Sequence, residues 1–149
     1  MQRLDKTIVL SEDFKKTLDK ITGDYLLLTL TEGWCGDAAQ LVPLFACIEK
    51  YHPKLKLKIL LRDEHPQIME KYLTNGSRSI PKIICLDEKT LIEKFNWGPR
   101  PEALQSLVIP MIKSGATKAE KSLFIQKWYN SDKTLTAQKE LAPLFHKLQ

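Results

Sequence analysis

Residues 25–30 read YLLLTL, and this apolar run constrains the fold more than any other part of the chain. A strand with one face in water alternates apolar and polar residues, whereas a run without alternation is typical of a strand buried on both faces. Both faces of such a strand must be covered, so we predict a central sheet with helices on each side. With 149 residues, the chain is long enough for one domain with a substantial core.

The rest of the chain supplies the other elements of a layered fold. Short strands are predicted at 7–10, 54–63, 81–87 and 90–97, and the turn between the last two predicts a hairpin. Helices are predicted at about 11–23, 36–51, 65–73, 101–113, 118–130 and 134–148. This order of elements predicts a mixed α/β sheet with a parallel part and a terminal hairpin, followed by further helices.

The composition excludes several classes of protein. The net charge is +5, but the lysines are scattered among acids and no basic block alternates with aromatic residues, so no nucleic-acid partner is predicted. No apolar run approaches the roughly 20 residues of a membrane-spanning helix, so no membrane association is predicted. The first residues, MQRLDKTIVLSEDF, lack the features of a signal peptide, which predicts a cytoplasmic location.

Three cysteines, Cys35, Cys47 and Cys85, are too widely spaced for a disulfide framework or a zinc site. Cys35 lies in the sequence GWCGDA, between the buried strand and a predicted helix. The first turn of a helix has unpaired N–H groups and a partial positive charge, and both stabilise a thiolate. The Asp37 carboxylate opposes this effect. We therefore expect a moderately activated thiol with a pKa below the ordinary value of about 8.5; the alternative is a buried, inert cysteine.

The GWCGDA sequence resembles the active site of the thioredoxin superfamily, which reads Trp-Cys-Gly-Pro-Cys at the start of a helix. Pro43 lies five residues after Ala38, where thioredoxins have a proline after the second cysteine. The segments RDEHPQIMEKYL and SIPKIICLD, and Gly98 before the last core helix, agree with the family in order and spacing. The resemblance covers about residues 5–113. It implies a thioredoxin-like fold, with a helical extension at about 114–149 in the same single domain.

The resemblance also implies the residues of the site. Cys35 would be the reactive residue, and Pro81 would follow a cis peptide bond and lie against it. The Ile80 backbone would then pair with an extended peptide or a thiol tripeptide. Trp97 has the alternative role of packing in the hairpin, and Arg100 either binds a substrate carboxylate or is simply solvated. The implied substrate-binding residues are Trp34, Gly36, Asp37, Ser79, Ile80, Pro81, Trp97 and Gly98.

Several departures from the family limit the function that the resemblance implies. Ala38 replaces the second active-site cysteine, and Cys47, about 18 Å further along the helix axis, is beyond disulfide reach. Thr29 takes the position of the family's buried acid, and Asp37 replaces the proline of the motif. Dithiol reduction of the thioredoxin type is therefore not expected. The sequence is most similar to bacterial thioredoxin-like proteins with a single-cysteine GWCGDA site.

Three hypotheses for the function follow. In the first, the Cys35 thiolate attacks a disulfide or a sulfenic acid, and an external thiol such as glutathione resolves the mixed disulfide. The partners would be protein or small-molecule thiols and disulfides. In the second, the protein is a redox-inactive binding or adaptor module that uses the groove beside cis-Pro81. In the third, Cys35 of two chains and two glutathione molecules hold an iron–sulfur cluster; otherwise no cofactor and no metal are expected, and the oligomeric state stays open.

Overall fold

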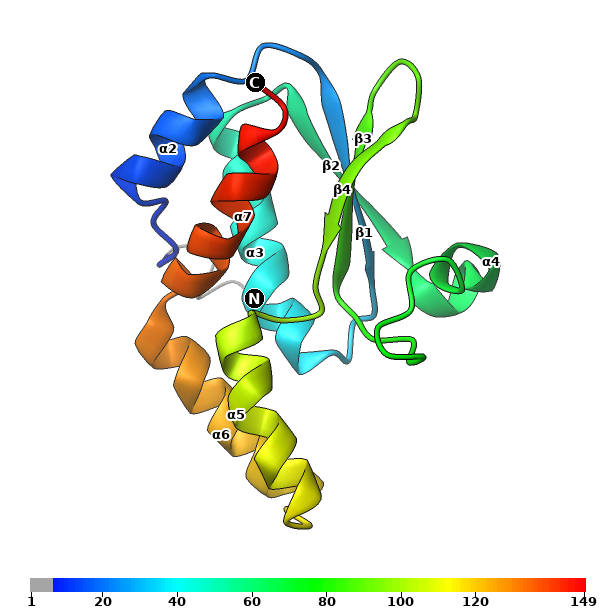
Figure 1. Cartoon of the computed structure of the whole chain (residues 1–149), viewed down its shortest axis with the longest axis vertical. Coiled ribbons are helices and arrows are strands. Elements are labelled where there is room, and N and C mark those ends of the chain that lie inside the picture. The colour runs from blue at the N-terminus through cyan, green and yellow to red at the C-terminus, as the bar shows by residue number, and fades with distance from the viewer. Residues whose placement is uncertain (1–6) are drawn as a thin grey trace.

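Four strands form the centre of the computed structural model, which describes residues 7–149 (Figure 1). They are β1 Tyr25–Thr31, β2 Leu55–Leu61, β3 Lys82–Asp87 and β4 Glu93–Trp97. Their order across the sheet is β2-β1-β3-β4. β1 pairs with β2 in parallel, and β3 is antiparallel to both β1 and β4. The predicted mixed sheet with a parallel part and a terminal hairpin is therefore confirmed.

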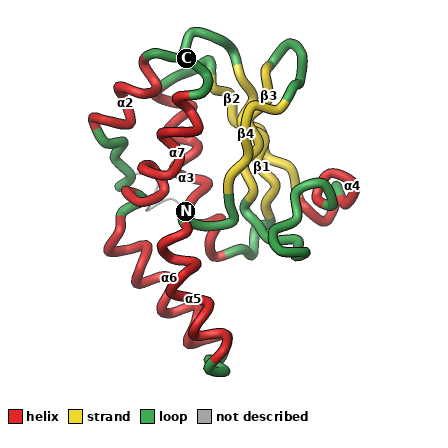
Figure 2. Tube along the Cα trace, in the orientation of Figure 1, coloured by secondary structure: helices red, strands yellow, loops and turns green. Residues whose placement is uncertain are grey.

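Helices cover both faces of the sheet, as predicted (Figures 1 and 2). The described helices are α2 Glu12–Asp19, α3 Gly36–Tyr51, α4 Pro66–Met69, α5 Glu102–Lys113, α6 Lys118–Asp132 and α7 Leu135–His146, with a short 3₁₀ helix η1 at Arg62–Glu64. α2, α3 and α7 lie on one side of the sheet, and α4 lies on the other (Figure 1). Within the described chain, no helix is both long and apolar enough to cross a membrane.

The central strand β1 buries apolar side chains on both of its faces, so helices must pack on both sides of the sheet. Leu27 and Leu30 are both fully buried, but they belong to separate apolar clusters. Leu27 packs with residues of α2, α3 and α7, whereas Leu30 packs with Met69 of α4. The absence of alternation in the YLLLTL run therefore reflects burial of both strand faces.

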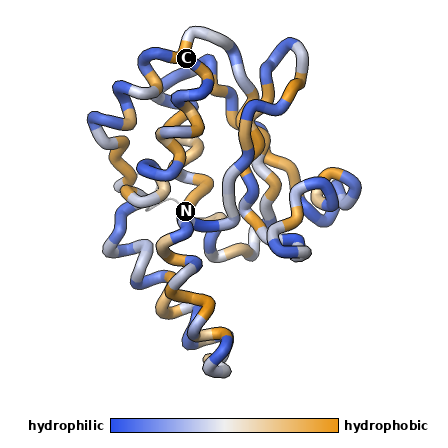
Figure 3. Tube along the Cα trace, in the orientation of Figure 1, coloured by the Kyte–Doolittle hydropathy of each residue, from blue (hydrophilic) through white to orange (hydrophobic). Residues whose placement is uncertain are grey.

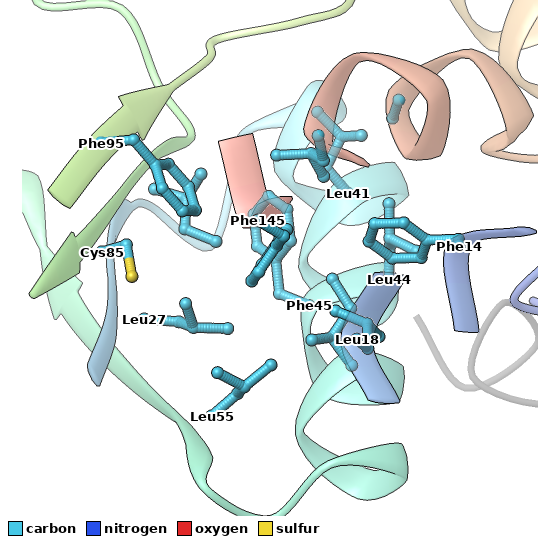
Figure 4. Packing of buried hydrophobic residues seen from close by; sticks show 14 of the residues in the cluster. Phe14, Leu18, Leu27, Leu41, Leu44, Phe45, Leu55, Cys85, Phe95 and Phe145 are labelled. Carbon is cyan, nitrogen blue, oxygen red and sulfur yellow. The ribbon is translucent and has the colours of Figure 1, made fainter. Parts of the chain in front are cut away.

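Aromatic residues from distant parts of the chain meet in the larger cluster (Figure 4). The Phe145 ring of α7 makes edge contacts with Phe14 of α2 and Phe95 of β4, at ring-centre distances of 5.8 and 5.1 Å. Phe45 of α3 is also fully buried in this cluster. The last helix thus contributes to the same core as the sheet and the first described helix.

The prediction of a strand at residues 7–10 is wrong, because this segment belongs to no strand in the structure. Its backbone pairs instead with the side chain of Gln138 on α7. The Gln138 amide donates to the Val9 carbonyl oxygen at 3.0 Å, and its oxygen accepts from Ser11 N–H at 2.8 Å. Residues 5 and 6, where the resemblance begins, lie outside the described residues.

The pair of helices α5 and α6 projects away from the sheet (Figure 1). α6 begins with a capping box, in which Thr117 and Glu120 bond each other's backbone N–H groups. Apolar residues occur along both helices (Figure 3), and Leu107, Ile112 and Leu123 are about half exposed. At its C-terminal end α6 returns to the core, where Tyr129 is buried.

Candidate functional site

Cys35 caps the N-terminus of α3. Its Sγ accepts a hydrogen bond from the Ala38 N–H and donates one to the Ile80 carbonyl oxygen, both at 3.4 Å. The Ile80–Pro81 peptide bond is cis, and a second cis bond joins Gly98 to Pro99. The thiol is therefore held between the first turn of α3 and the loop that leads into β3.

A groove of about 570 Å³ lies beside the thiol. Trp34, Ser79, Ile80 and Gly98, all implied by the resemblance, line it together with Cys35. The indole of Trp34 is 67% exposed, so a bound molecule can stack on it. The groove thus combines an exposed aromatic side chain with the Cys35 thiol.

Charged side chains in the groove wall are mostly cationic. Arg62, Arg78 and Arg100 line it, against one carboxylate, that of Glu102. The Arg62 guanidinium carbon lies 5.0 Å from the centre of the Trp34 ring, which is a cation–π distance. Arg62 is paired with Asp63 and Arg100 with Asp37, so Arg78, 3.9 Å from Glu70, is the least tightly paired of the three cations.

Two contacts fix the loops that frame the groove. Gly98 has a φ of +119°, and a Cβ there would collide with the Pro81 carbonyl oxygen, so only glycine fits. The buried Lys82 ammonium donates to the Gly98 carbonyl oxygen and to Thr74 Oγ1, each at 2.8 Å. Burial lowers the Lys82 pKa. Both walls of the groove are therefore tied to the start of β3.

Asp37, two residues after Cys35, is 8% exposed and is held by two distant side chains. Arg100 donates to its Oδ2 at 2.7 Å, and the Tyr129 hydroxyl donates to its Oδ1 at 2.8 Å. Burial and the Asp37 charge raise the pKa of Tyr129, so this residue is a neutral donor. The Asp37–Arg100–Tyr129 cluster joins the Cys35 turn to helix α6.

The expected fall in the Cys35 pKa is wrong: the pKa is raised. Burial of the thiol is the largest cause, because desolvation disfavours the thiolate, and the Asp37 charge acts in the same direction. The N–H groups of Ala38 and Asp37 and the Arg100 charge lower the pKa, but they do not compensate. The helix N-terminus alone therefore does not decide the ionisation of this thiol.

The other two cysteines lie away from the groove. Burial raises the Cys85 pKa to about 12, so this thiol in β3 is inert. Cys47 is half-buried and packs against the larger apolar cluster. None of the three forms a disulfide. Across residues 7–149, no group of three or more His, Cys, Asp and Glu side chains could hold a metal ion.

The structure places the remaining predicted residues in four different surroundings. Gly36 and Asp37 line a neighbouring cavity rather than the Cys35 groove. Pro81 is buried, and Trp97 packs edge-on against Phe45, in line with the alternative of hairpin packing. Arg100 is neither simply solvated nor free for a substrate, because its side chain is 18% exposed and paired with Asp37.

Sequence reasoning missed several residues of the site. Arg62 is the first residue of η1, and Arg78 lies in the loop before β3. Nothing in their local sequence distinguishes them from solvated arginines. Ile109 and Ile112 of α5 extend the groove with apolar surface. Tyr129 was overlooked because it lies 92 residues from Asp37. The one available signal was the paired Trp128 and Tyr129, an unusual aromatic density for a surface helix.

Comparison with known proteins agrees with this geometry. A strand, a cysteine-capped helix and a facing cis-proline define a thioredoxin-like protein. The model of the family described as Thioredoxin matches residues 1–121, and the chain belongs to this family. Proteins of the family typically need no cofactor. No significant match is found among curated proteins.

Solved structures with similar folds include the following two. One is a Pseudomonas aeruginosa protein of unknown function, with 18% sequence identity and a TM-score of 0.71. The alignment covers 99% of this chain and 80% of that one. The other is an HIV epitope scaffold, with 19% identity, a TM-score of 0.67, and coverage of 96% and 78%. At these identities the similarity shows the fold alone.

Proposed function

We propose that the protein carries out thiol–disulfide exchange through the single thiol of Cys35, with an external thiol completing the reaction. The observation that carries this proposal is the position of Sγ, which caps α3 beside an open groove and faces the Ile80 carbonyl next to cis-Pro81. Cys35 is the one cysteine that lines this groove. A mixed disulfide formed there has no second thiol of the groove to displace it.

The reaction has two exchange steps. The Cys35 thiolate attacks one sulfur of a disulfide, forms a mixed disulfide with it, and releases the other half as a thiolate, which takes up a proton. A small external thiol, ionised in its turn, then attacks the substrate sulfur of the mixed disulfide. This step restores the Cys35 thiolate and leaves a disulfide between the substrate and the small thiol. A second molecule of the small thiol then attacks the disulfide between the substrate and the first small thiol. The substrate is released as a thiol, and the two small-thiol molecules leave as their own disulfide.

The groove favours substrates that carry carboxylates. Arg78 is exposed and its partner Glu70 is 3.9 Å away, so its guanidinium is available to an anion. Arg62 is directed toward Trp34, which stacks with planar or apolar groups. A glutathione-type thiol has both a reactive sulfur and carboxylates. It therefore suits the groove as the resolving thiol.

Incubation of the reduced protein with oxidised glutathione is expected to attach one glutathionyl group to Cys35. Intact-mass and peptide mass spectrometry would locate the adduct. Cys35→Ser should abolish it, whereas Cys47→Ser, the matched control, should leave it unchanged. An adduct that persists in Cys35→Ser, on Cys47 or Cys85, would overturn the proposal.

The rate of exchange is expected to rise with pH beyond the range of a free thiol. Because the pKa of Cys35 is raised, its thiolate fraction increases tenfold per pH unit up to a midpoint above the ordinary value of about 8.5. Asp37→Asn removes a charge that raises this pKa, so its midpoint should move to lower pH. Alkylation by iodoacetamide, followed by mass spectrometry between pH 6 and 11, measures both midpoints.

Asp13→Asn is the matched control for the pH profile, since Asp13 is an exposed carboxylate on α2. Its midpoint should equal that of the unchanged protein. A Cys35 midpoint at or below that of a free thiol would contradict the proposed environment. So would an equal midpoint in the Asp37→Asn variant.

The raised Cys35 pKa also favours a second function, that of a redox-inactive binding module. In this case the groove holds an extended peptide, and the thiol does not react near neutral pH. Peptides selected from a random library should then bind Cys35→Ala and the unchanged protein equally. Loss of peptide binding in Arg78→Glu, together with absence of the glutathionyl adduct, would favour this function over exchange.

A further inference from the structure

A second cavity lies next to the Cys35 groove, between the first turn of α3, helix α5 and helix α6. Its volume is about 490 Å³, within the range of cavities that hold small molecules. Gly36, Val108 and Ile125 line it from these three helices. α6 spans Lys118–Asp132 and so lies mostly beyond residue 121, where the family match ends. The matched residues alone would not enclose this space.

One part of the cavity wall is hydrocarbon. Ala39 of α3, Val108 and Ile112 of α5, and Ile125 of α6 contribute it. Val108 is 2% exposed and belongs to the core, whereas Ile112 is 54% exposed. The apolar lining therefore runs from the interior of the protein to its surface. A hydrocarbon chain or ring bound along it would be removed from contact with water, which is favourable.

The charges in the wall are mostly positive. Arg100, Lys118 and Lys121 line the cavity, and Asp37 is the one carboxylate among the lining residues. Both oxygens of Asp37 already accept hydrogen bonds, from Arg100 and Tyr129. Gly36 adds the N-terminal end of a 16-residue helix, which favours an anion. The excess positive charge thus has no partner within the wall.

We propose that this space, the α3–α5–α6 cavity, binds a small amphipathic carboxylate, a molecule with one anionic head and a hydrocarbon body. The head would lie toward Lys121 and the body along Val108 and Ile125. Arg100 and Ile112 line both this cavity and the Cys35 groove. A molecule bound here lies beside the reactive thiol, but its binding does not require thiol exchange.

Titration of the full-length, reduced protein with octanoate tests this proposal by calorimetry. We expect one octanoate per chain. Both acetate, which lacks the hydrocarbon body, and 1-octanol, which lacks the charge, should bind at least about tenfold more weakly, a difference of about 1.4 kcal/mol. Lys121→Glu should weaken octanoate binding by at least about tenfold on the same scale. Lys127→Glu, on the same helix but outside the cavity wall, is the matched control and should change it by less than about twofold.

Three results would overturn the proposal. The first is no saturable binding up to about 10 mM octanoate, which would mean a Kd above about 10 mM. The second is equal weakening by Lys121→Glu and Lys127→Glu, which would mean diffuse attraction to a basic helix. The third is weakening by Arg78→Glu but not by Lys121→Glu, which would place octanoate in the Cys35 groove. Circular dichroism of each variant establishes that it is folded.

Discussion

Replacement of Arg100 with methionine is expected to lower the free energy of unfolding by about 3–5 kcal/mol, because it leaves a buried charge without its partner. The Asp37 side chain is 11% exposed, and the Arg100 guanidinium, 2.7 Å away, is the cation paired with it. Methionine has a similar reach but no charge. The Tyr129 hydroxyl alone cannot neutralise the carboxylate. Urea unfolding followed by fluorescence measures the loss.

The double variant Arg100→Met with Asp37→Asn tests the physical reason for this loss. Its cluster contains a neutral amide in place of the carboxylate, so most of the stability should return. Arg78→Met is the matched control. Its side chain is 42% exposed and its ion pair is long, so the change should stay within about 0.5 kcal/mol. A double variant no more stable than Arg100→Met would show that lost packing, not the unpaired charge, destabilises the protein.

Truncation of Phe145 to alanine is expected to cost about 3–5 kcal/mol, as for other fully buried aromatic residues. Its ring is 0% exposed and contacts Phe14 and Phe95, so its loss opens a cavity where α2, α7 and β4 meet. The same urea experiment measures it. Such a loss would establish that the helical extension belongs to the folding unit.

Leu123→Ala is the matched control for Phe145→Ala within the extension. Leu123 is 53% exposed on α6, so its removal should change stability by no more than about 0.5 kcal/mol. If Phe145→Ala had an equally small effect, α7 would be a peripheral helix. In that case the single-domain organisation that we propose for the chain would be wrong.

Most strands and helices are predictable from the sequence, because their apolar periodicity is local. The YLLLTL run indicates a doubly buried strand without knowledge of what covers it. The segment 7–10 shows where this reasoning fails. Its apolar residues resemble those of a strand, but its backbone pairs with Gln138, 129 residues from Val9. A hydrogen bond between a side chain and the backbone of a distant segment produces no recognisable sequence pattern in either segment.

The position of Cys35 in the candidate site is predictable from the sequence, but its pKa and the contacts of Asp37 are not. The GWCGDA sequence places Cys35 at the start of a helix because the strand and the helix on either side are both evident. The direction of its pKa is not predictable, since burial by the surrounding fold is the largest cause. The role of Asp37 is also not local. Its partners Arg100 and Tyr129 lie 63 and 92 residues further along the chain.

The contact between Gln138 and the segment 9–11 has a consequence for synthesis of the chain. The ribosome makes the N-terminal segment first, yet the Gln138 side chain that binds the Ser11 backbone comes 127 residues later. Phe14 of α2 likewise packs against Phe145 of α7, far along the chain. The nascent chain therefore leaves these groups without their native partners until α7 has been made. The larger apolar cluster can therefore close only after α7 has been synthesised.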